Sequence, residues 1–586
     1  MDIFGHYHNE LTKIIMDFSQ SETNIPQLSD DFSFQVERPN DAAHGDISTN
    51  IAMKLAKPWG MKPRDIAEKL TSQIESLEGV ASVAIAGPGF INFILKDDIY
   101  HKVVRHLVQH EKIVLAQTIS SLPVNVEYVS ANPTGPLHLG HVRGAVFGDA
   151  LSALLEKVGY DVTREYYVND AGNQIDALAS SVFLRYKEAL GEDIGDIPQG
   201  MYPGEYLIPL GQSLAKEFGD NLRIMDEDER RALLRKKAVK AMLDLIREDL
   251  ETLNIQHDVF FSEESLTQGT PNAIEVMETA LREQNLIYIG KLEPPKGKMP
   301  EDWEDRDQLL FKASSFGDDS DRALRKSDGT HTYFAADVAY AYDKYRRGFR
   351  KLIFVLGADH TGYVKRLSAV GAAVSQGQAK VDVKICQLVK LMKEGQPFKM
   401  SKRAGTMVMM RDIVDEVGSD PIRFMMLFRK NEAALDFDVA KVLEKNRENP
   451  VFYVQYAYAR CASAFRNVAQ EIPSLSLTTK ALEASDLALL THESEKNVMM
   501  ILADYEKMLH TAAQHHEPHR ISFYLYELAT RFNSWWTAGK SDANLRFIQE
   551  QKPELTLARL ALVQGVKAIL QDGLTILGVS TPERME

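Results

Sequence analysis

Cysteine is nearly absent from this sequence. Cys386 and Cys461 are its only two cysteines in 586 residues, and they lie in unrelated contexts. Two such cysteines exclude a disulfide framework and a zinc site built from thiolates. We therefore expect both to be small, buried apolar residues.

Long apolar runs are also absent. No stretch approaches the roughly 20 apolar residues that span a bilayer. The first residues, MDIFGHYHNELTKII, lack a basic segment that leads into an apolar one, so they do not predict a signal peptide. We expect a cytoplasmic protein that is not associated with a membrane.

An excess of positive charge is missing as well. The net charge is -15, from 83 acidic and 68 basic residues. Non-specific binding of nucleic acids depends on neutralising phosphates, so this charge argues against indiscriminate binding. The negative net charge does not exclude a nucleic acid that is recognised through local basic patches. The stretches 344–351 (KYRRGFRK) and 399–411 are two such patches, although a solvated helix face is the simpler explanation for either.

The length and the hydrophobic patterns predict a multidomain α/β protein. Residues 1–112 mix helical patterns with short apolar strands, which indicates a small α+β domain. Residues 120–445 alternate strands and helices in the manner of a parallel sheet, with a polar helical insertion near 176–300. Residues 446–586 repeat apolar side chains at helical spacing and predict an all-α bundle.

One junction in the second region carries two histidines. An alternating strand at 124–130 (VNVEYVS) is followed by PTGPLHLGHVRGA at 133–145, where prolines and glycines end the strand and a helix begins near His138. His138 and His141 thus fall in the first helical turn, at the carboxyl end of a parallel strand. Ligands of α/β sheets bind at that location, and the free N–H groups of a helix start favour an anion.

The pair His138 and His141 has two interpretations. Their ring N–H groups can hold phosphate oxygens, or the rings can share a zinc ion. No third metal ligand follows at a recognisable spacing, and HExxH is absent. Gly140 between them leaves space for a purine ring or a ribose, which favours a nucleotide.

A second segment suits the same ligand. KMSKRAGT at 399–406 places Lys399, Lys402 and Arg403 in a stretch of small residues that we expect to be mobile. Lysines in such a segment can close on a polyphosphate and follow its charge as a bond breaks.

These two segments together resemble the HIGH and KMSKS signatures of class I aminoacyl-tRNA synthetases. Leu139 replaces isoleucine in the first, and Arg403 replaces the last serine of the second. Longer stretches are similar to arginyl-tRNA synthetases of the bacterial type, and the resemblance covers essentially the whole chain. They include SANPTGPLHLGHVRGAVFGDALSALLEKVGYDVTREYYVNDAGNQI, VLGADHTGYVKR and NPVFYVQYAYARCASA.

The resemblance implies a function and a fold. The fold is a Rossmann-like catalytic core with a helical insertion, an N-terminal domain that touches the tRNA elbow, and a helical anticodon-binding domain. The reaction joins L-arginine to tRNA(Arg) through arginyl-adenylate, with ATP as substrate, and the family characteristically needs bound tRNA before it activates the amino acid. Mg²⁺ is expected to accompany ATP without a protein cage, so no protein-bound metal is expected, and the family favours a monomer.

The resemblance also implies site residues. For ATP binding they are His138, Gly140, His141, Lys399, Met400, Ser401 and Lys402, of which the histidines and lysines also act in catalysis. For arginine they are Glu127, Asn132, Tyr333, Asp337 and His360. We expect Asp337 and Tyr333 to hold the guanidinium, and Asn132 and Glu127 to hold the backbone end.

Two of these carboxylates have structural alternatives. Asp337 can instead pair with Lys344 or Arg347 of the same charged region, and Glu127 can be a paired carboxylate within its strand. A site with a forked acceptor for guanidinium also selects its substrate. If lysine or citrulline binds there, polar groups of the site stay unpaired, which disfavours these molecules strongly. A separate editing domain is therefore not required.

Aromatic residues in the last region are candidates for stacking on anticodon bases, because unpaired RNA is commonly read on aromatic faces. The alternative for each is an ordinary place in the helical core. The candidates are Tyr453, Tyr456, Tyr458 and Trp536.

Three rival functions remain at this point. A synthetase for another amino acid would share the signatures, whereas a small nucleotidyltransferase would lack the first and last regions. A non-catalytic tRNA-binding paralogue would have lost residues from the two signatures, yet His138, His141, Lys399 and Lys402 are all present.

Overall fold

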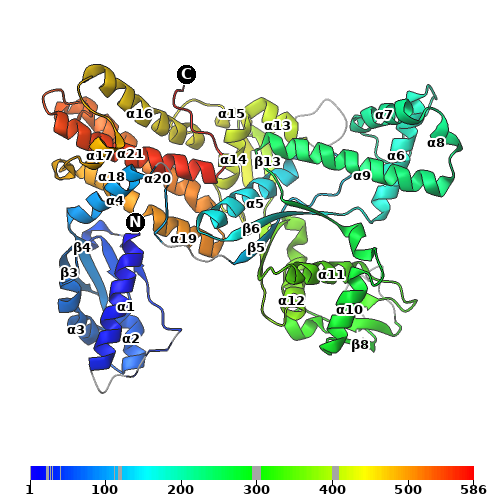
Figure 1. Ribbon diagram of the computed structural model, residues 1–586, viewed down its shortest axis with the longest axis horizontal. Coiled ribbons are helices and arrows are strands. Elements are labelled where there is room, and N and C mark those ends of the chain that lie inside the picture. Colours follow the sequence, from blue (N-terminus) through cyan, green and yellow to red (C-terminus); the bar gives the residue numbers. More distant parts are fainter. Residues whose placement is uncertain are drawn as a thin grey trace.

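The fold is seen in a computed structural model that describes residues 2–21, 26, 28–29, 31–39, 41–110, 113–116, 122–292, 305–398 and 408–585. A central sheet region lies between an N-terminal domain and helical bundle on one side and two excursions from the sheet on the other (Figure 1). The predicted mixed α/β fold with a parallel sheet and a C-terminal helical region is confirmed.

The N-terminal domain is a sheet covered by helices. Its strands run in the order β1-β2-β4-β3 and every pairing is antiparallel. The elements are α1 (Ile3–Ser21), β1 (Val36–Glu37), β2 (Ile47–Thr49), α2 (Ile51–Trp59), α3 (Pro63–Glu75), β3 (Val80–Ala86) and β4 (Phe90–Leu95). The next helix, α4 (Asp97–Gln109), packs against the C-terminal bundle. A second contact joins the domain to the bundle: the Nε–H and Nη2–H groups of Arg38 donate to the Asp504 carboxylate.

The central sheet has five parallel strands in the order β12-β11-β5-β6-β7. They are β5 (Pro123–Glu127), β6 (Asp161–Val168), β7 (Val259–Ser262), β11 (Lys351–Gly357) and β12 (Lys380–Cys386). Chain order reverses between β5 and β11, so a crevice opens beyond the carboxyl ends of these two strands. The helices α5 (Leu139–Lys157), α11 (Tyr333–Arg346) and α12 (Val364–Val374) follow or precede these strands.

The stretch predicted as one helical insertion consists of two excursions. The first is helical, with its own apolar core, and contains α6 (Asn173–Ala189), α7 (Ile208–Phe218), α8 (Asn221–Ile224) and α9 (Glu227–Thr252). Strand β7 then returns to the central sheet before the second excursion begins. That one holds α10 (Ala273–Glu283) and an antiparallel sheet of β8 (Ile287–Gly290), β9 (Gln308–Phe311) and β10 (Arg322–Arg325).

A fourth sheet lies between the core and the bundle in the chain. It comprises β13 (Val389–Lys393), β14 (Gln396–Pro397) and β15 (Leu435–Asp438), with helices α13 (Met410–Val417), α14 (Ser419–Leu427) and α15 (Val439–Val442). The bundle follows with α16 (Pro450–Glu471), α17 (Thr479–Glu483), α18 (Glu493–Ala503), α19 (Tyr505–His515), α20 (His519–Ser541) and α21 (Pro553–Ile576). Both cysteines are buried and unbonded, as predicted. Among the described residues, no helix is long and apolar enough to cross a membrane.

Candidate functional site

The two histidines at the start of α5 are held by backbone hydrogen bonds. His138 is the N-cap residue, and its Nδ1 accepts the Gly140 N–H at 3.1 Å. The His141 Nδ1 accepts the His138 N–H at 3.3 Å, and the two ring centroids are 3.9 Å apart. Since each Nδ1 acts as an acceptor, this network assigns the proton of each neutral ring to Nε2. Both rings therefore offer an Nε2–H donor.

The surroundings keep these rings neutral. Burial lowers the pKa of His141 to about 4, the nearby His138 ring lowers it further, and Asp359 opposes the shift. Burial also lowers the pKa of His138. Near pH 7 the rings therefore act on an anion as hydrogen-bond donors, and the positive end of the α5 dipole adds the electrostatic attraction.

Gly140 serves the His138 cap directly. A Cβ built at Gly140 would lie 2.9 Å from the His138 Cε1, so any side chain there would displace the ring that caps the helix. The outer side of Gly140 is exposed. The glycine thus has a local role in addition to the space for a nucleotide that the sequence predicts.

The segments that flank the two signatures pair with each other. The Leu139 N–H donates to the Val408 carbonyl at 2.9 Å, and the Met410 N–H donates to the Leu137 carbonyl at 2.9 Å. Residues 408–410 follow the KMSKR segment (399–403) in the chain, and this pairing places them against the start of α5. Lys399, Met400, Ser401 and Lys402 themselves lie outside the described residues.

A carboxylate from the helical excursion joins this contact. Asp249, near the end of α9, is 1% exposed. Its Oδ2 accepts the Leu137 N–H at 2.9 Å, and its Oδ1 accepts the Arg411 Nε–H at 3.3 Å. Nothing in the charged pattern of α9 distinguishes Asp249 from its neighbouring acids, so the sequence alone does not predict this role.

Tyr333 and Asp337 lie one turn apart at the start of α11. The Tyr333 side chain is 76% exposed, whereas Asp337 is partly buried. Neither forms a side-chain hydrogen bond or ion pair with another residue in the described part of the chain. Burial raises the pKa of Asp337 to about 7; Arg366 opposes this, and Glu263 and Glu127 add to it. Near pH 7 this carboxyl is therefore only partly ionised, and a cation beside it would stabilise the charged form.

The structure assigns other partners to the two cations considered for Asp337. The Lys344 Nζ lies 2.7 Å from the Glu127 Oε2, and the Arg347 guanidinium donates to both oxygens of Glu165. The alternative in which Lys344 or Arg347 neutralises Asp337 is therefore wrong.

Glu127 itself is paired at one oxygen. Lys344 is fully buried, where it also donates to the Asn125 Oδ1 at 2.6 Å and lies over the rings of Tyr340 and Phe354. The other oxygen of Glu127, Oε1, has the Ser130 hydroxyl at 3.4 Å. The structural interpretation of Glu127 thus applies to Oε2, while Oε1 is only weakly engaged.

Asn132 and His360 follow the ends of neighbouring strands. Asn132 is exposed in the turn after β5, and His360 is exposed in the 3₁₀ helix Ala358–Tyr363 after β11. The His360 Nε2 lies 3.4 Å from the Asp359 Oδ2. Because β5 and β11 are adjacent and parallel, both residues border the same crevice as His138.

The four aromatic candidates in the bundle differ in their surroundings. Tyr458 is 4% exposed and sits in the core, and Tyr453 packs against Tyr526. Tyr456 and Trp536 both contact the Arg460 guanidinium, at 4.3 and 5.5 Å from their ring centroids. Trp536 also lines a cavity of about 680 Å³ with polar residues that include Asn467, Lys540 and Arg546.

Metal ligands do not gather at any of these places. Within the described ranges, no group of three or more His, Cys, Asp or Glu side chains is arranged to hold a metal ion.

Comparison with known families matches nearly all of the chain. Residues 6–95 match the arginyl tRNA synthetase N terminal domain, residues 102–445 the class I (R) tRNA synthetase catalytic domain, and residues 454–585 the DALR anticodon binding domain. An arginine–tRNA ligase of Agrobacterium fabrum is 50% identical over 587 residues, and one of Parvibaculum lavamentivorans is 52% identical over 586 residues; both alignments cover 100% of each chain.

The fold is similar to solved structures as well. The arginyl-tRNA synthetase of Thermus thermophilus superposes with a TM-score of 0.73 at 20% identity and covers 100% of both chains. That of Plasmodium falciparum superposes with a TM-score of 0.71 at 18% identity and covers 100% of this chain and 99% of its own.

Proposed function

Because the chain belongs to the class I arginyl-tRNA synthetase family, we propose which of its residues perform each step of that family's reaction. The chain is an arginine–tRNA ligase that uses ATP to attach L-arginine to tRNA(Arg). An arginine carboxylate oxygen bonds to the α-phosphorus of ATP as the bond to pyrophosphate breaks, which gives arginyl-adenylate. The terminal ribose hydroxyl of the tRNA then takes the arginyl group and releases AMP. Synthetases for other amino acids and non-catalytic paralogues are not favoured.

At the start of α5, the Nε2–H groups of His138 and His141 hold the ATP phosphates. This role is supported by the network that fixes both Nδ1 atoms as acceptors. Lys399 and Lys402 neutralise the departing pyrophosphate, and Met400 and Ser401 belong to the same ATP-binding segment. This role is supported by the backbone pairing of residues 137–139 with residues 408–410, which follow that segment in the chain. No covalent intermediate with the protein is required, because positioning and charge neutralisation suffice for phosphoryl transfer.

Mg²⁺ accompanies the ATP in this proposal. Mg²⁺ commonly keeps several water ligands and binds through substrate phosphates, so it would need no cage of protein ligands here. Bound there, it would neutralise phosphate charge.

The arginine site lies across the crevice from α5. Asp337 receives the guanidinium through charge-assisted hydrogen bonds, and the exposed Tyr333 ring covers its face. The weakly engaged Oε1 of Glu127 and the side chain of Asn132 take the α-ammonium, and His360 borders the pocket. The observation that carries this assignment is the Asp337 carboxylate, which has no hydrogen-bond or ion-pair partner among the described residues and lies one turn from an exposed tyrosine.

The tRNA contacts the outer domains. We assign base stacking to Trp536 and Tyr456, because their rings share Arg460 beside the cavity. Tyr453 and Tyr458 support the helix from within the bundle. The domain at 1–112 contacts the tRNA elbow, residues 120–445 catalyse, and residues 446–586 bind the anticodon. We further propose that the enzyme acts as a monomer in the cytoplasm, and that bound tRNA is required for adenylate formation.

The variant Asp337→Asn tests the arginine site. Removing the charge that faces the guanidinium should raise the KM for arginine by about 100-fold, as expected for a charge-assisted interaction, and leave the KM for ATP within twofold. Steady-state aminoacylation measures both constants. Asp343→Asn is the matched control, because Asp343 lies on the same helix but pairs with Arg347. An unchanged KM for arginine in Asp337→Asn would remove Asp337 from the site.

A further inference from the structure

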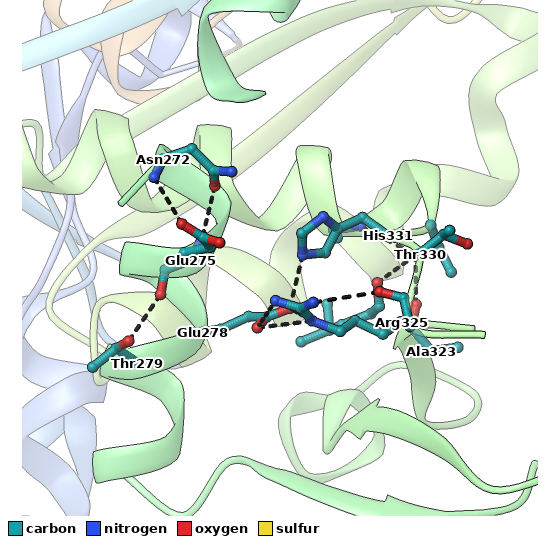
Figure 2. A network of polar contacts seen from close by, with 12 residues as sticks. Asn272, Glu275, Glu278, Thr279, Ala323, Arg325, Thr330 and His331 are labelled. Carbon is teal, nitrogen blue, oxygen red and sulfur yellow. Dashed lines mark hydrogen bonds and ion pairs between the residues drawn. The ribbon is translucent and has the colours of Figure 1, made fainter. Parts of the chain in front are cut away.

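A buried carboxylate with no role in the proposed reaction lies on α10, the helix that packs against α11. Glu278 on α10 is 5% exposed and receives two parallel hydrogen bonds from Arg325 of β10, at 2.8 Å from Nε to Oε1 and 2.8 Å from Nη2 to Oε2. The His331 Nε2 lies 3.2 Å from the same Oε1 (Figure 2). A buried carboxylate is costly unless it is paired, so this contact fixes α10 firmly against the residues that hold it.

Arg325 and His331 are the two ends of one tight turn. They form an antiparallel backbone bridge, and inside it the Lys326 N–H donates to the Thr330 carbonyl at 2.8 Å. The Arg325 Nη1 also donates to the Gly329 carbonyl at 3.3 Å. Arg325 therefore ties one end of the turn to Glu278 by hydrogen bonds, and the His331 ring at the other end lies beside the same carboxylate.

Helix α11 begins directly after this turn. Thr332 is its N-cap: the Thr332 Oγ1 accepts the Ala335 N–H at 3.3 Å and donates to the Ala323 carbonyl of β10 at 2.7 Å. The next residue is Tyr333, whose side chain makes no hydrogen bond or ring contact with the rest of the described chain. The position of Tyr333 is therefore set by its backbone, and the backbone is anchored at Thr332 and at the turn.

We propose that Glu278 is a positioning residue for the arginine site, which fixes the start of α11 through Arg325 and His331 and so places Tyr333 and Asp337 for the guanidinium. This inference rests on the proposed function, because it requires Tyr333 and Asp337 to bind arginine. Glu278 does not touch the substrate. Glu278 orders the backbone at the start of α11 before arginine binds. Without Glu278, arginine binding would have to supply the free energy that orders this backbone.

Helix α10 offers a matched control one turn earlier. Glu275 is the acid of a capping box: its Oε2 accepts the Asn272 N–H at 3.0 Å, and its own N–H donates to the Asn272 Oδ1 at 2.9 Å (Figure 2). Among the described residues, Glu275 forms no hydrogen bond or ion pair with β10 or the turn. Its replacement perturbs the same helix without releasing the start of α11.

The experiment compares Glu278→Gln with Glu275→Gln in aminoacylation by the full-length enzyme. Glu278→Gln should raise the KM for arginine about tenfold, the factor that corresponds to ordering roughly one backbone residue, with the KM for ATP and kcat within twofold. Glu275→Gln should leave all three constants within twofold. The inference is overturned if the KM for arginine stays unchanged in Glu278→Gln, or if the KM values for arginine and ATP rise equally.

Two further variants complete the test. Arg325→Lys keeps the positive charge but loses the two parallel hydrogen bonds of the guanidinium, so it should raise the KM for arginine by a smaller factor. If Glu278→Gln does not fold, an unchanged KM for arginine in Arg325→Lys overturns the inference.

Tyr333→Ala distinguishes a failure of the proposed arginine site from a failure of the positioning role of Glu278. If Tyr333→Ala leaves the KM for arginine unchanged, the proposed arginine site is wrong. If Tyr333→Ala raises it and Glu278→Gln does not, only the positioning role fails.

Discussion

Burial shifts the pKa values of single residues at the proposed sites. At the proposed ATP site, burial lowers the pKa values of His138 and His141, so both rings are neutral hydrogen-bond donors, and the start of α5 supplies positive charge. Asp337 faces a cation with its pKa raised to about 7 by burial. The lowered pKa values of the histidines and the raised pKa of Asp337 all arise from desolvation. A cationic substrate beside Asp337 would lower its pKa again.

The state of Asp337 predicts a pH dependence. With a pKa of about 7, the free carboxyl is mostly protonated at pH 6 and mostly charged at pH 8, and only the charged form pairs with guanidinium. The KM for arginine should therefore fall about tenfold as the pH rises from 6 to 8. Steady-state measurements across this range check it, with Asp337→Asn as the reference variant. A KM that is independent of pH in the unsubstituted enzyme would contradict the assignment.

Sequence alone predicts residues whose signals are local. The histidines of α5 are identified because prolines, glycines and helical spacing surround them within a few positions. The sequence does not predict the partner of Glu127, because Lys344 lies 217 residues away and its pairing depends on how α11 packs on the sheet. The same holds for Asp249, which lies 112 residues from Leu137.

At the scale of secondary-structure elements, the crevice is built where three segments meet. Backbone hydrogen bonds join the start of α5 to residues 408–410, where α13 begins. Asp249, near the end of α9, binds Leu137 beside α5 and Arg411 of α13. Helix α9 extends from this point into the helical excursion (Figure 1). The excursion is therefore anchored at the proposed ATP site.

Asp249→Ala should destabilise this junction. The substitution leaves the buried Leu137 N–H without its acceptor, which should cost about 1–3 kcal/mol of unfolding free energy. Arg411 is 46% exposed, so the loss of its ion pair adds little. Glu248→Ala is the control, because Glu248 is 66% exposed and 3.8 Å from Arg411, and it should change stability by less than about 1 kcal/mol. Denaturant unfolding of both variants measures the difference. Equal stabilities would show that Asp249 does not hold the junction.

Elements also show why part of the fold escapes prediction. The apolar run of β5 and the stripe of α5 are strong periodic signals, and both elements form as expected. Strand β7 has four residues and only intermediate burial, so it does not stand out within a polar, helix-rich stretch. Its place at the edge of the sheet follows from pairing with β6, which is a tertiary property.

At the scale of the whole molecule, the outer domains support one central site. The N-terminal domain is attached to the bundle through Arg38 and Asp504, and the bundle packs on the core through α14, α16 and α20. The predicted order of an α+β domain, a parallel-sheet core and a helical region appears in the structure (Figure 1). This arrangement suits a ligand as large as a tRNA, whose two ends are read far apart.

The most direct test of the central claim is ATP–pyrophosphate exchange with each of the twenty amino acids, with and without tRNA(Arg). The proposed arginine site predicts exchange with arginine alone, because lysine and other side chains leave Asp337 without its forked partner. The proposed coupling predicts that this exchange appears only when tRNA is present. Exchange with a different amino acid would contradict the assignment of the arginine site, and arginine-dependent exchange without tRNA would contradict the coupling.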